Sequence, residues 1–354
     1  MIRVLVVDDS GFMRLALRRI IEAEGDLRVV GEAADGTSAL ECAARLRPDI
    51  VSLDLEMPPP DGLATARRLM DLPDPPAVVM VSHHTRDGSD AALAALAAGA
   101  ADVLWKGSAR GGLDLGHIDR ELRSRLRHWA AQRGARPIAS PARPGPLAPA
   151  TVPPPPEAPP EDGACDIVVI GASTGGPDAL AALLTSAGPL SVPCAIAQHM
   201  PADLGPDFAR HLGRRTGLPV VLGERGLHLR TGEVVLLPGA TDGHLARSPE
   251  GGFTLRLAKG EGPVHPSVDL LLRSAALVAH RALGVVLTGM GRDGSAGAAA
   301  MRARGMPVLV QSPESCVVGG MPGAVLSAGH ATEVADPAAL GLRLRALTRR
   351  LAPA

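Results

Sequence analysis

The hydrophobic pattern of residues 1–127 alternates between two periods. Short apolar runs are each followed by a segment in which apolar residues return once per helical turn. Apolar runs are typical of buried strands and the second spacing of amphipathic helices, so the alternation predicts a parallel, doubly wound α/β sheet. The predicted strands are Arg3–Val7, Arg28–Ala33, Ile50–Leu53, Ala77–Ser82 and Asp102–Trp105, and the predicted helices are Arg14–Glu24, Gly36–Leu46, Gly62–Leu72 and Ser89–Ala98.

The same alternation resumes after residue 164 and predicts a second α/β domain with a mostly parallel sheet. A hairpin between residues 233–237 and Thr254–Leu257 is also predicted. The predicted strands are Asp166–Gly171, Cys194–Gln198, Glu233–Leu237, Gly284–Thr288 and Pro307–Gln311, and the predicted helices are Asp178–Thr185, Pro206–Arg215, Val268–Val278, Ser295–Arg304 and Ala338–Leu351.

A proline-rich stretch separates the two patterns. Between Pro137 and Pro160 lie 11 of the 33 prolines, each of which fixes φ and removes a backbone donor. This density favours a semi-extended linker, with a proline-rich ligand for a recognition domain as the alternative. The predicted organisation is a domain over 1–127, a linker over 128–163 and a domain over 164–354.

Composition narrows the class of function. With two Trp, three Phe, no Tyr and a formal net charge of −1, the chain lacks the stacking residues and basic surface of nucleic-acid-binding proteins. Residues 1–127 are net acidic and residues 164–354 net basic, so the two domains attract each other weakly. Four cysteines without a CxxC pair argue against a zinc knuckle or a disulfide scaffold. The longest apolar stretch, Ala91–Ala101, is shorter than a membrane span of ~18 residues, so a cytoplasmic protein is expected.

Five polar residues of the first domain fall at the ends of predicted strands. Asp8 and Asp9 follow the first strand and Asp54 the third, and parallel topology gathers these ends at one edge of the sheet. Adjacent carboxylates repel each other, so they need a cation between them, and their oxygens suit Mg²⁺. Ser82 and Lys106 can contact a phosphoryl group bound at the same edge. Taken singly, Asp54 is better explained as a helix cap and Ser82 as a turn residue. Taken together, the five predict a phosphoryl-acceptor carboxylate beside a metal ion.

The pattern VVDDSGFMR…DLEMPPPDG…VSHH…WK resembles the receiver domain of bacterial response regulators over residues 1 to about 125. The resemblance implies a flavodoxin-like, five-stranded domain in which Asp54 accepts phosphate from a chemotaxis histidine kinase. It further implies that Asp8, Asp9 and Asp54 hold Mg²⁺ together with a backbone carbonyl near Glu56. The sequence departs from the family at Gly107, where Pro is common, and at Val103, where an aromatic switch residue is common.

In the second domain, IGASTGGP follows a predicted strand and precedes a helix. Such a turn can hold phosphate or expose a nucleophilic serine. Dinucleotide binding expects an acid at the end of the next strand, where the sequence has Gln198-His199 instead. This difference favours Ser173 as a nucleophile.

A base and an orienting acid are available at other strand ends. His199 can take the Ser173 proton, and Asp293 in LTGMGRDGS can orient His199. Backbone N–H groups of Met290 and Gly291 are candidate oxyanion donors. Taken singly, His199 is better explained as a structural histidine and Asp293 as a turn acid. His244 and His265 are weaker site candidates.

The motifs GASTGGP, QHMP, PG…HL, PSVD, LTGMGRDG and CVVGGMP resemble the catalytic domain of the chemotaxis protein-glutamate methylesterases over residues 165 to about 350. The resemblance implies that Ser173 is the nucleophile, His199 the base and Asp293 its orienter. It also implies a site lined by Thr174, Met290 and His244. The implied substrates are glutamyl methyl esters on the helical cytoplasmic domains of chemoreceptors, with deamidation of receptor glutamines as a related activity. Ester hydrolysis needs no cofactor.

Departures from the methylesterase pattern occur at His265, Gly319 and Gly323. None of them belongs to the predicted triad. The hypothesis is that the unphosphorylated receiver covers the catalytic cleft and that phosphorylation of Asp54 shifts the equilibrium towards release. Two alternatives stay open: a non-enzymatic, receiver-controlled protein that binds receptors, and a hydrolase of another ester.

Overall fold

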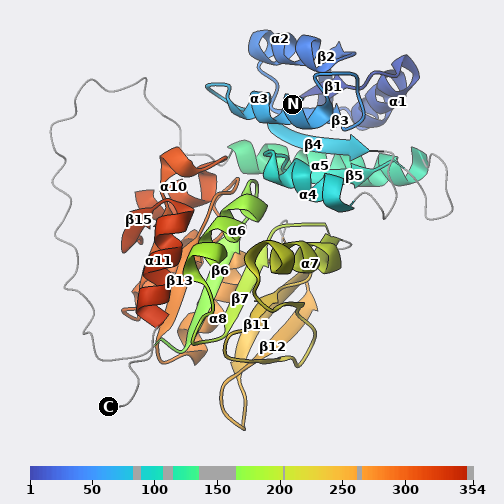
Figure 1. Ribbon diagram of the computed structural model, residues 1–354. Helices are drawn as coiled ribbons and strands as arrows, with labels where there is room; N and C mark the ends of the chain where they lie inside the picture. The colour runs from blue at the N-terminus through green and yellow to red at the C-terminus, as the bar shows by residue number, and fades with distance from the viewer. Residues whose placement is uncertain (83–88, 107–114, 135–164, 202–203, 261–264, 349–354) are drawn as a thin grey trace, which may run out of the picture.

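The computed structural model describes residues 1–82, 89–106, 115–134, 165–201, 204–260 and 265–348. Residues 2–105 form a five-stranded parallel sheet in the order β2-β1-β3-β4-β5 (Figure 1). The predicted doubly wound fold of the first domain is therefore confirmed. Its elements are β1 Ile2–Val7, α1 Gly11–Glu22, β2 Leu27–Ala33, α2 Gly36–Leu46, β3 Ile50–Asp54, α3 Gly62–Met70, β4 Ala77–Ser82, α4 Ser89–Ala97 and β5 Asp102–Trp105.

Side-chain caps explain where the first helices begin. Ser10 accepts the backbone N–H of Met13 and Asp35 that of Ser38, which satisfies donors that the first helical turn leaves unpaired. Strands β3 and β4 are buried along their whole length, as expected for central strands covered by helices on both faces.

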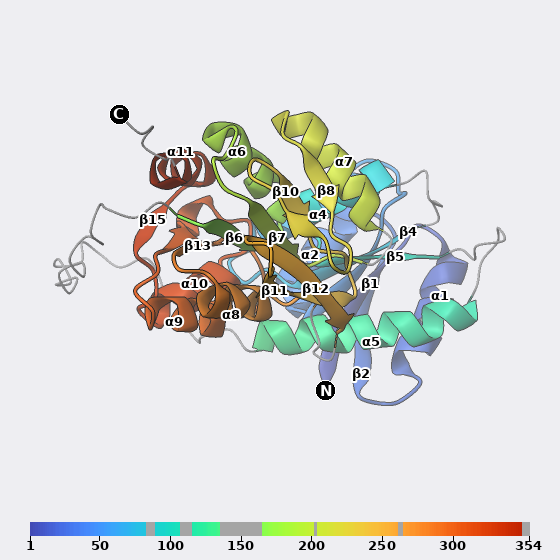
Figure 2. The same ribbon diagram turned by 90° about the horizontal axis from the view of Figure 1, so that it is seen from below.

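Helix α5 (Leu115–Gly134) crosses the predicted domain boundary at residue 127. The linker prediction therefore began too early, because Trp129 and Ala130 are buried within a helix that continues past the receiver sheet. Figure 2 shows α5 running from the receiver towards the second domain. The remainder of the predicted linker, residues 135–163, lies outside the described residues.

The second domain is built on a seven-stranded sheet in the order β15-β14-β13-β6-β7-β10-β8, in which every pair is parallel. This confirms the predicted parallel α/β architecture. Its elements are β6 Ile167–Ala172, α6 Gly176–Ala187, β7 Cys194–Gln198, α7 Gly205–Thr216, β8 Val220–Leu222, β10 Val234–Leu236, α8 Val268–Val278, β13 Ala282–Val286, α9 Ser295–Arg302, β14 Val308–Gln311, η3 Pro313–Ser315, α10 Gly320–Ser327, β15 Glu333–Ala335 and α11 Pro337–Thr348.

The predicted hairpin assigned the wrong partner strand to residues 254–257. Strand β12 (Phe253–Lys259) pairs antiparallel with β11 (Thr241–Arg247) and β9 (His228–Leu229), not with residues 233–237. Strand β10 is fully buried between β7 and β8 in the parallel sheet, so it has no free edge for β12. The polar sequence of β11 hid this strand from pattern analysis, although its Leu245 lies opposite Leu255 in a buried apolar core.

The two domains share apolar packing. Leu93 and Leu96 of α4 belong to the same hydrophobic core as Leu180 of α6. Trp129 of α5 likewise belongs to one core with Met290 of the second domain. Among the described residues, no helix combines the length and the apolar character that crossing a membrane requires.

Candidate functional site

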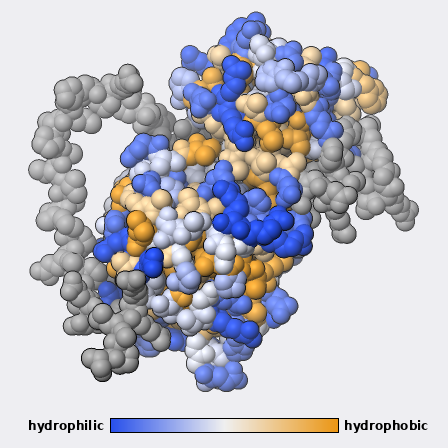
Figure 3. Space-filling model, viewed as in Figure 1, coloured by the Kyte–Doolittle hydropathy of each residue, from blue (hydrophilic) through white to orange (hydrophobic). Residues whose placement is uncertain are grey.

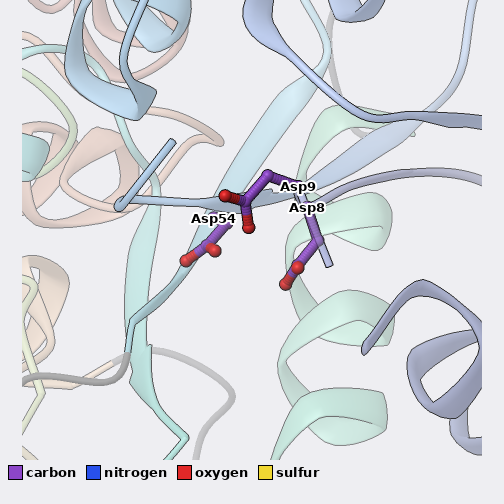
Figure 4. A group of neighbouring side chains, drawn as sticks. All are labelled: Asp8, Asp9 and Asp54. Carbon is purple, nitrogen blue, oxygen red and sulfur yellow. The ribbon is translucent and has the colours of Figure 1, made fainter. Parts of the chain in front are cut away.

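The acidic residues of the receiver meet at the carboxyl edge of its sheet (Figure 4). Asp8 and Asp9 follow β1, and Asp54 ends the neighbouring strand β3. One carboxylate oxygen from each of the three lies within 4.8 Å of the others. Asp8 and Asp54 are buried, whereas Asp9 is exposed. Three carboxylate oxygens at this spacing fit the oxygen ligand set that Mg²⁺ prefers.

A buried lysine faces this cluster. Lys106 Nζ lies 2.7 Å from Asp8 Oδ2 and 3.0 Å from Asp54 Oδ1, and its side chain is fully buried. Burial raises the pKa of the Asp54 carboxyl and the neighbouring Asp8 adds to this, while the Lys106 charge acts in the opposite direction. Ser82 ends β4 beside this site, and its carbonyl accepts the N–H of Lys106 at 2.7 Å. One lysine against three carboxylates leaves room for a further cation.

In the second domain, Ser173 lies on the tight turn between β6 and α6. The N–H of Gly176 donates to the Ser173 carbonyl at 2.7 Å, and Gly175 has a φ of 77°. A side chain at Gly176 would overlap Gln198 Oε1, so only glycine fits beneath the turn. Ser173 itself is buried rather than exposed at the surface of the turn.

His199 and Asp293 are in direct contact. His199 Nε2 lies 3.0 Å from Asp293 Oδ2. The Asp293 carboxylate also accepts the backbone N–H groups of Val268 and Asp269, each at 2.8 Å, at the start of α8. Burial favours a raised pKa for Asp293, but the hydrogen bond and charge of His199 and these N–H donors outweigh it and hold the pKa below its usual value. The carboxylate is therefore ionised and fixed in place.

Buried polar atoms without a hydrogen-bond partner gather at this site. Eight such side-chain atoms occur among the described residues, and five belong to the candidate site or face it. Buried polar atoms are normally paired, so this concentration indicates a place where a polar ligand binds. The five atoms are Ser173 Oγ, Thr174 Oγ1, Gln198 Oε1, His199 Nδ1 and His128 Nε2.

The orientation of His199 assigns its two ring nitrogens. Because Nε2 contacts Asp293, Nδ1 is the nitrogen left for Ser173. Ser173 Oγ and His199 Nδ1 are each unpaired here, so no hydrogen bond joins the predicted nucleophile to the predicted base. Such bonds are often long before substrate binds. The structure thus contains the His199–Asp293 hydrogen bond but not a hydrogen bond between Ser173 Oγ and His199 Nδ1.

The remaining predicted site residues of the second domain lie in different surroundings, some buried and one exposed. Met290 is buried against the receiver core, and Gly291 adopts a φ of 81° beside the Gln132 side chain of α5. His244 is exposed on β11 opposite Arg256, and no contact with the predicted triad is found within the described ranges. His265, the weaker candidate, is half-buried, with Nδ1 3.0 Å from Asp242 Oδ1.

Sequence reasoning missed three residues that support the site. Gln198 Nε2 donates to the carbonyls of Ser173 and His199, both at 2.9 Å. Thr288 Oγ1 donates to the Thr174 carbonyl at 2.9 Å. His128 of α5 lies near the site, where burial, followed by the charges of His199 and His265, lowers its pKa to about 4. Only Gln198, next to His199 in QHMP, carried a signal in the sequence.

Fold and sites together define a class: a response regulator, in which a receiver with a buried aspartate cluster is packed against an α/β output domain. Comparisons with known proteins place it within that class. The model of the response regulator receiver domain matches residues 4–114, and the model of the CheB methylesterase matches residues 168–344. The chain belongs to the CheB methylesterase family.

Named relatives match almost end to end. A protein-glutamate methylesterase/protein-glutamine glutaminase from a Nocardioides species is 40% identical and covers 99% of this chain and 96% of that protein. One from Myxococcus xanthus is 43% identical over 94% of both chains. Among solved structures, the CheB methylesterase catalytic domain of Thermotoga maritima is 33% identical and covers 52% of this chain and all of that one, with a TM-score of 0.48.

Proposed function

We propose that this chain is a phosphorylation-activated protein-glutamate methylesterase of chemotaxis adaptation. It hydrolyses glutamyl methyl esters on the cytoplasmic domains of chemoreceptors and deamidates receptor glutamines. The observation that carries the proposal is the His199–Asp293 pair beside Ser173, beneath a receiver with a buried Asp54. A cytoplasmic location follows from the substrate.

The proposed chemistry is acyl transfer through serine. Ser173 Oγ attacks the ester carbonyl carbon while its proton passes to His199 Nδ1, which leaves an oxyanion on the carbonyl oxygen. Met290 and Gly291 N–H groups are the proposed oxyanion donors, and Thr174 lines the site. The acyl–methoxy bond then breaks, and the methoxy oxygen takes the proton from His199 and leaves as methanol. Water attacks the acyl-serine with the same base, releasing glutamate and restoring Ser173. For a glutamine substrate, the leaving group is ammonia.

The receiver is the proposed switch. Asp54 would accept a phosphoryl group from a histidine kinase. A carboxylate oxygen of Asp54 bonds to the phosphorus, and the bond between the phosphorus and the kinase histidine breaks. Asp8, Asp9, Asp54 and the Glu56 carbonyl would hold Mg²⁺, which supplies charge compensation during phosphoryl transfer when bound. Lys106, already paired with Asp54, and Ser82 would contact the phosphoryl oxygens.

Contacts between the domains support a closed, unphosphorylated state. The Leu96 carbonyl of α4 accepts the N–H of Gly175, two residues after Ser173, at 3.1 Å. On the opposite side, α5 brings Trp129 into one hydrophobic core with Met290 and places Gln132 beside Gly291. Phosphorylation acts by favouring the released arrangement over this one.

Methanol release from methyl-esterified receptor membranes tests the proposal. Wild type, Ser173→Ala and Asp54→Ala are compared with and without Mg²⁺ and a small phosphodonor. Release is expected to need Ser173 and to rise with phosphodonor only when Asp54 is present. Hydrolysis of p-nitrophenyl acetate without release from any receptor would instead indicate a hydrolase of another ester. Receptor binding with no hydrolysis at all would indicate a non-enzymatic regulator.

A further inference from the structure

Helices α8 and α9 of the second domain both begin beside Asp293, and they lie side by side (Figure 2). A glycine lets them approach closely. A Cβ atom on Gly297 would lie 2.6 Å from Leu272 Cβ and 3.0 Å from the carbonyl oxygen of Asp269. The first turns of the two helices are therefore packed directly against each other.

Each of these helices is capped by a carboxylate from the start of the other. Asp293, just before α9, accepts the N–H groups of Val268 and Asp269 in the first turn of α8, each at 2.8 Å. Asp269 Oδ1 in turn accepts the N–H groups of Gly294 at 3.0 Å and Gly297 at 2.6 Å, at the start of α9. The first turn of a helix leaves such N–H groups without a partner inside the helix. Two carboxylates, one running each way, thus hold the two helix starts together.

Gly294 connects the two carboxylates. Its N–H lies 3.0 Å from Asp269 Oδ1 and 3.0 Å from Asp293 Oδ1, so the peptide that follows Asp293 is held from α8. Gly294 has a φ of 94° and no side chain with which to cap α9. A Cβ atom there would lie 2.9 Å from Val268 Cγ1, which leaves no room for a capping serine or aspartate. The side-chain cap of α9 comes from Asp269 instead.

Asp269 differs from an ordinary capping acid in its surroundings. Asp336 accepts the N–H groups of Ala338 and Ala339 at the start of α11 and is exposed. Charged side chains mostly lie at the surface in this way, as the hydrophilic patch over α7 in Figure 3 illustrates. Asp269 is instead half-buried, and burial, followed by the charge of Asp293, raises its pKa. A half-buried acid beside a like charge weakens the fold, and such groups concentrate at functional sites.

We infer that Asp269 is a positioning residue, which sets the place of Asp293 and, through it, the ring of His199. The hydrogen bonds of the Asp269 carboxylate go to α9, so it acts through Asp293 and not on the substrate. Asp293 Oδ2 lies 3.0 Å from His199 Nε2, and a shift of about 1 Å breaks a hydrogen bond of this length. Misplacement on that scale can lower a rate about 10²-fold. The inference rests on the proposed function, in which His199 is the base.

The test compares variants of the full chain activated by phosphodonor. Asp269→Ala removes both N–H bonds to α9, and kcat for methanol release from receptor membranes is expected to fall about tenfold to a hundredfold, with KM within about twofold. Hydrolysis of p-nitrophenyl acetate is expected to fall by the same factor, because one base serves both substrates. Asp336→Ala, which removes two N–H bonds at the start of α11, is the matched control and is expected to keep kcat. Equal kcat in the two variants overturns the inference.

Two further measurements separate positioning from a loss of fold. Asp269→Asn keeps an oxygen acceptor at the same place, so its kcat is expected to stay within about fivefold of wild type. A loss as large as that of Asp269→Ala would contradict the inference. The ¹⁵N resonances of the His199 ring, assigned by comparison with His199→Gln, report which nitrogen carries the proton. Wild type is expected to carry it on Nε2 and Asp269→Ala to show a mixture of both tautomers, and an unchanged tautomer in Asp269→Ala overturns the inference.

A further variant keeps the test open if Asp269→Ala does not fold. Asp269→Ser, whose shorter side chain can accept one N–H group, then takes its place, with a smaller loss of kcat in the same direction. The tautomer measurement needs no substrate, so it is independent of the reaction. A wild type that hydrolyses p-nitrophenyl acetate but releases no methanol from receptors contradicts the proposed function alone. A His199 tautomer that does not respond to Asp269 contradicts this inference alone.

Discussion

His199 turns its Nε2 towards Asp293 at 3.0 Å, and its Nδ1 remains unpaired within the site. The carboxylate therefore fixes both the ring orientation and the tautomer, since an ionised acceptor at Nε2 requires a proton there and leaves a lone pair on Nδ1, the proposed base.

Asp293→Asn tests this arrangement. An amide can present an N–H to Nε2 and stabilise the tautomer with its proton on Nδ1, so kcat for methanol release is expected to fall by about 10³-fold or more with little change in KM. Thermal unfolding checks that the fold is kept. A loss below tenfold would mean that another group orients His199.

Gln198 is expected to act as a positioning residue. Its amide joins the Ser173 and His199 carbonyls, and Gln198→Leu leaves both carbonyls short of a donor, at a cost of about 1–3 kcal/mol in stability. We expect kcat to fall by about tenfold to a hundredfold. Ser274→Ala, which removes buried hydrogen bonds to Leu245 and Leu271 away from the triad, is the matched control. If Gln198→Leu and Ser274→Ala have the same Tm and lose the same fraction of kcat, Gln198 has only a structural role.

Acid is expected to open the closed state. The pKa of His128 is about 4 while it is buried at the domain interface, against an ordinary value of 6.5, so the closed state binds fewer protons than the released one. Closure is therefore most stable above pH 6.5 and weakens as the pH falls, by about tenfold at pH 5.5. The charges of His199 and His265 add to the effect of burial in lowering the pKa of His128.

The measurement is the ratio of activity without phosphodonor to activity with it, taken across pH 5.5–8, because the ratio cancels any pH dependence of the hydrolysis step that both conditions share. The ratio is expected to rise towards acid in wild type and to become flat in His128→Gln. The same rise in both proteins would assign the effect to another group.

Lys106→Met is expected to destabilise the receiver strongly. It leaves the buried Asp8 and Asp54 carboxylates without their cation, a loss of about 3–5 kcal/mol. Mg²⁺ can replace part of that charge, so it should raise the Tm of the variant more than that of wild type. Lys259, the other lysine of the chain, is exposed on β12, and Lys259→Met serves as the control. A variant that Mg²⁺ does not stabilise would argue against a metal at the acidic cluster.

The sequence predicted what depends on strand order and local pattern. Strands such as Ala77–Ser82 and Cys194–Gln198 begin and end at the predicted residues, and the strand-end rule brought Asp8 to Asp54 and His199 to Asp293. Helix α5 escaped prediction because its second half packs between two domains and is too charged to show a clear apolar stripe.

Other parts of the site depend on tertiary packing. His244 and Asp242 are two residues apart on β11, yet only Asp242 contacts His265, and strand alternation gave no reason to choose between them. His128 comes near enough to His199 for their charges to interact only because α5 extends past its own domain, and no local pattern contains that information.

The position of Val317 between Gly99 and Gly175 couples the shapes of the two domains at this contact. A side chain gained at Gly99, or a larger residue at 317, disturbs a contact in the other domain as well. Mutations on one side of this contact are therefore tolerated only with compensation on the other. A chimera that joins this catalytic domain to a receiver with a bulkier residue in place of Gly99 should be active without a phosphodonor, because its two halves no longer fit together.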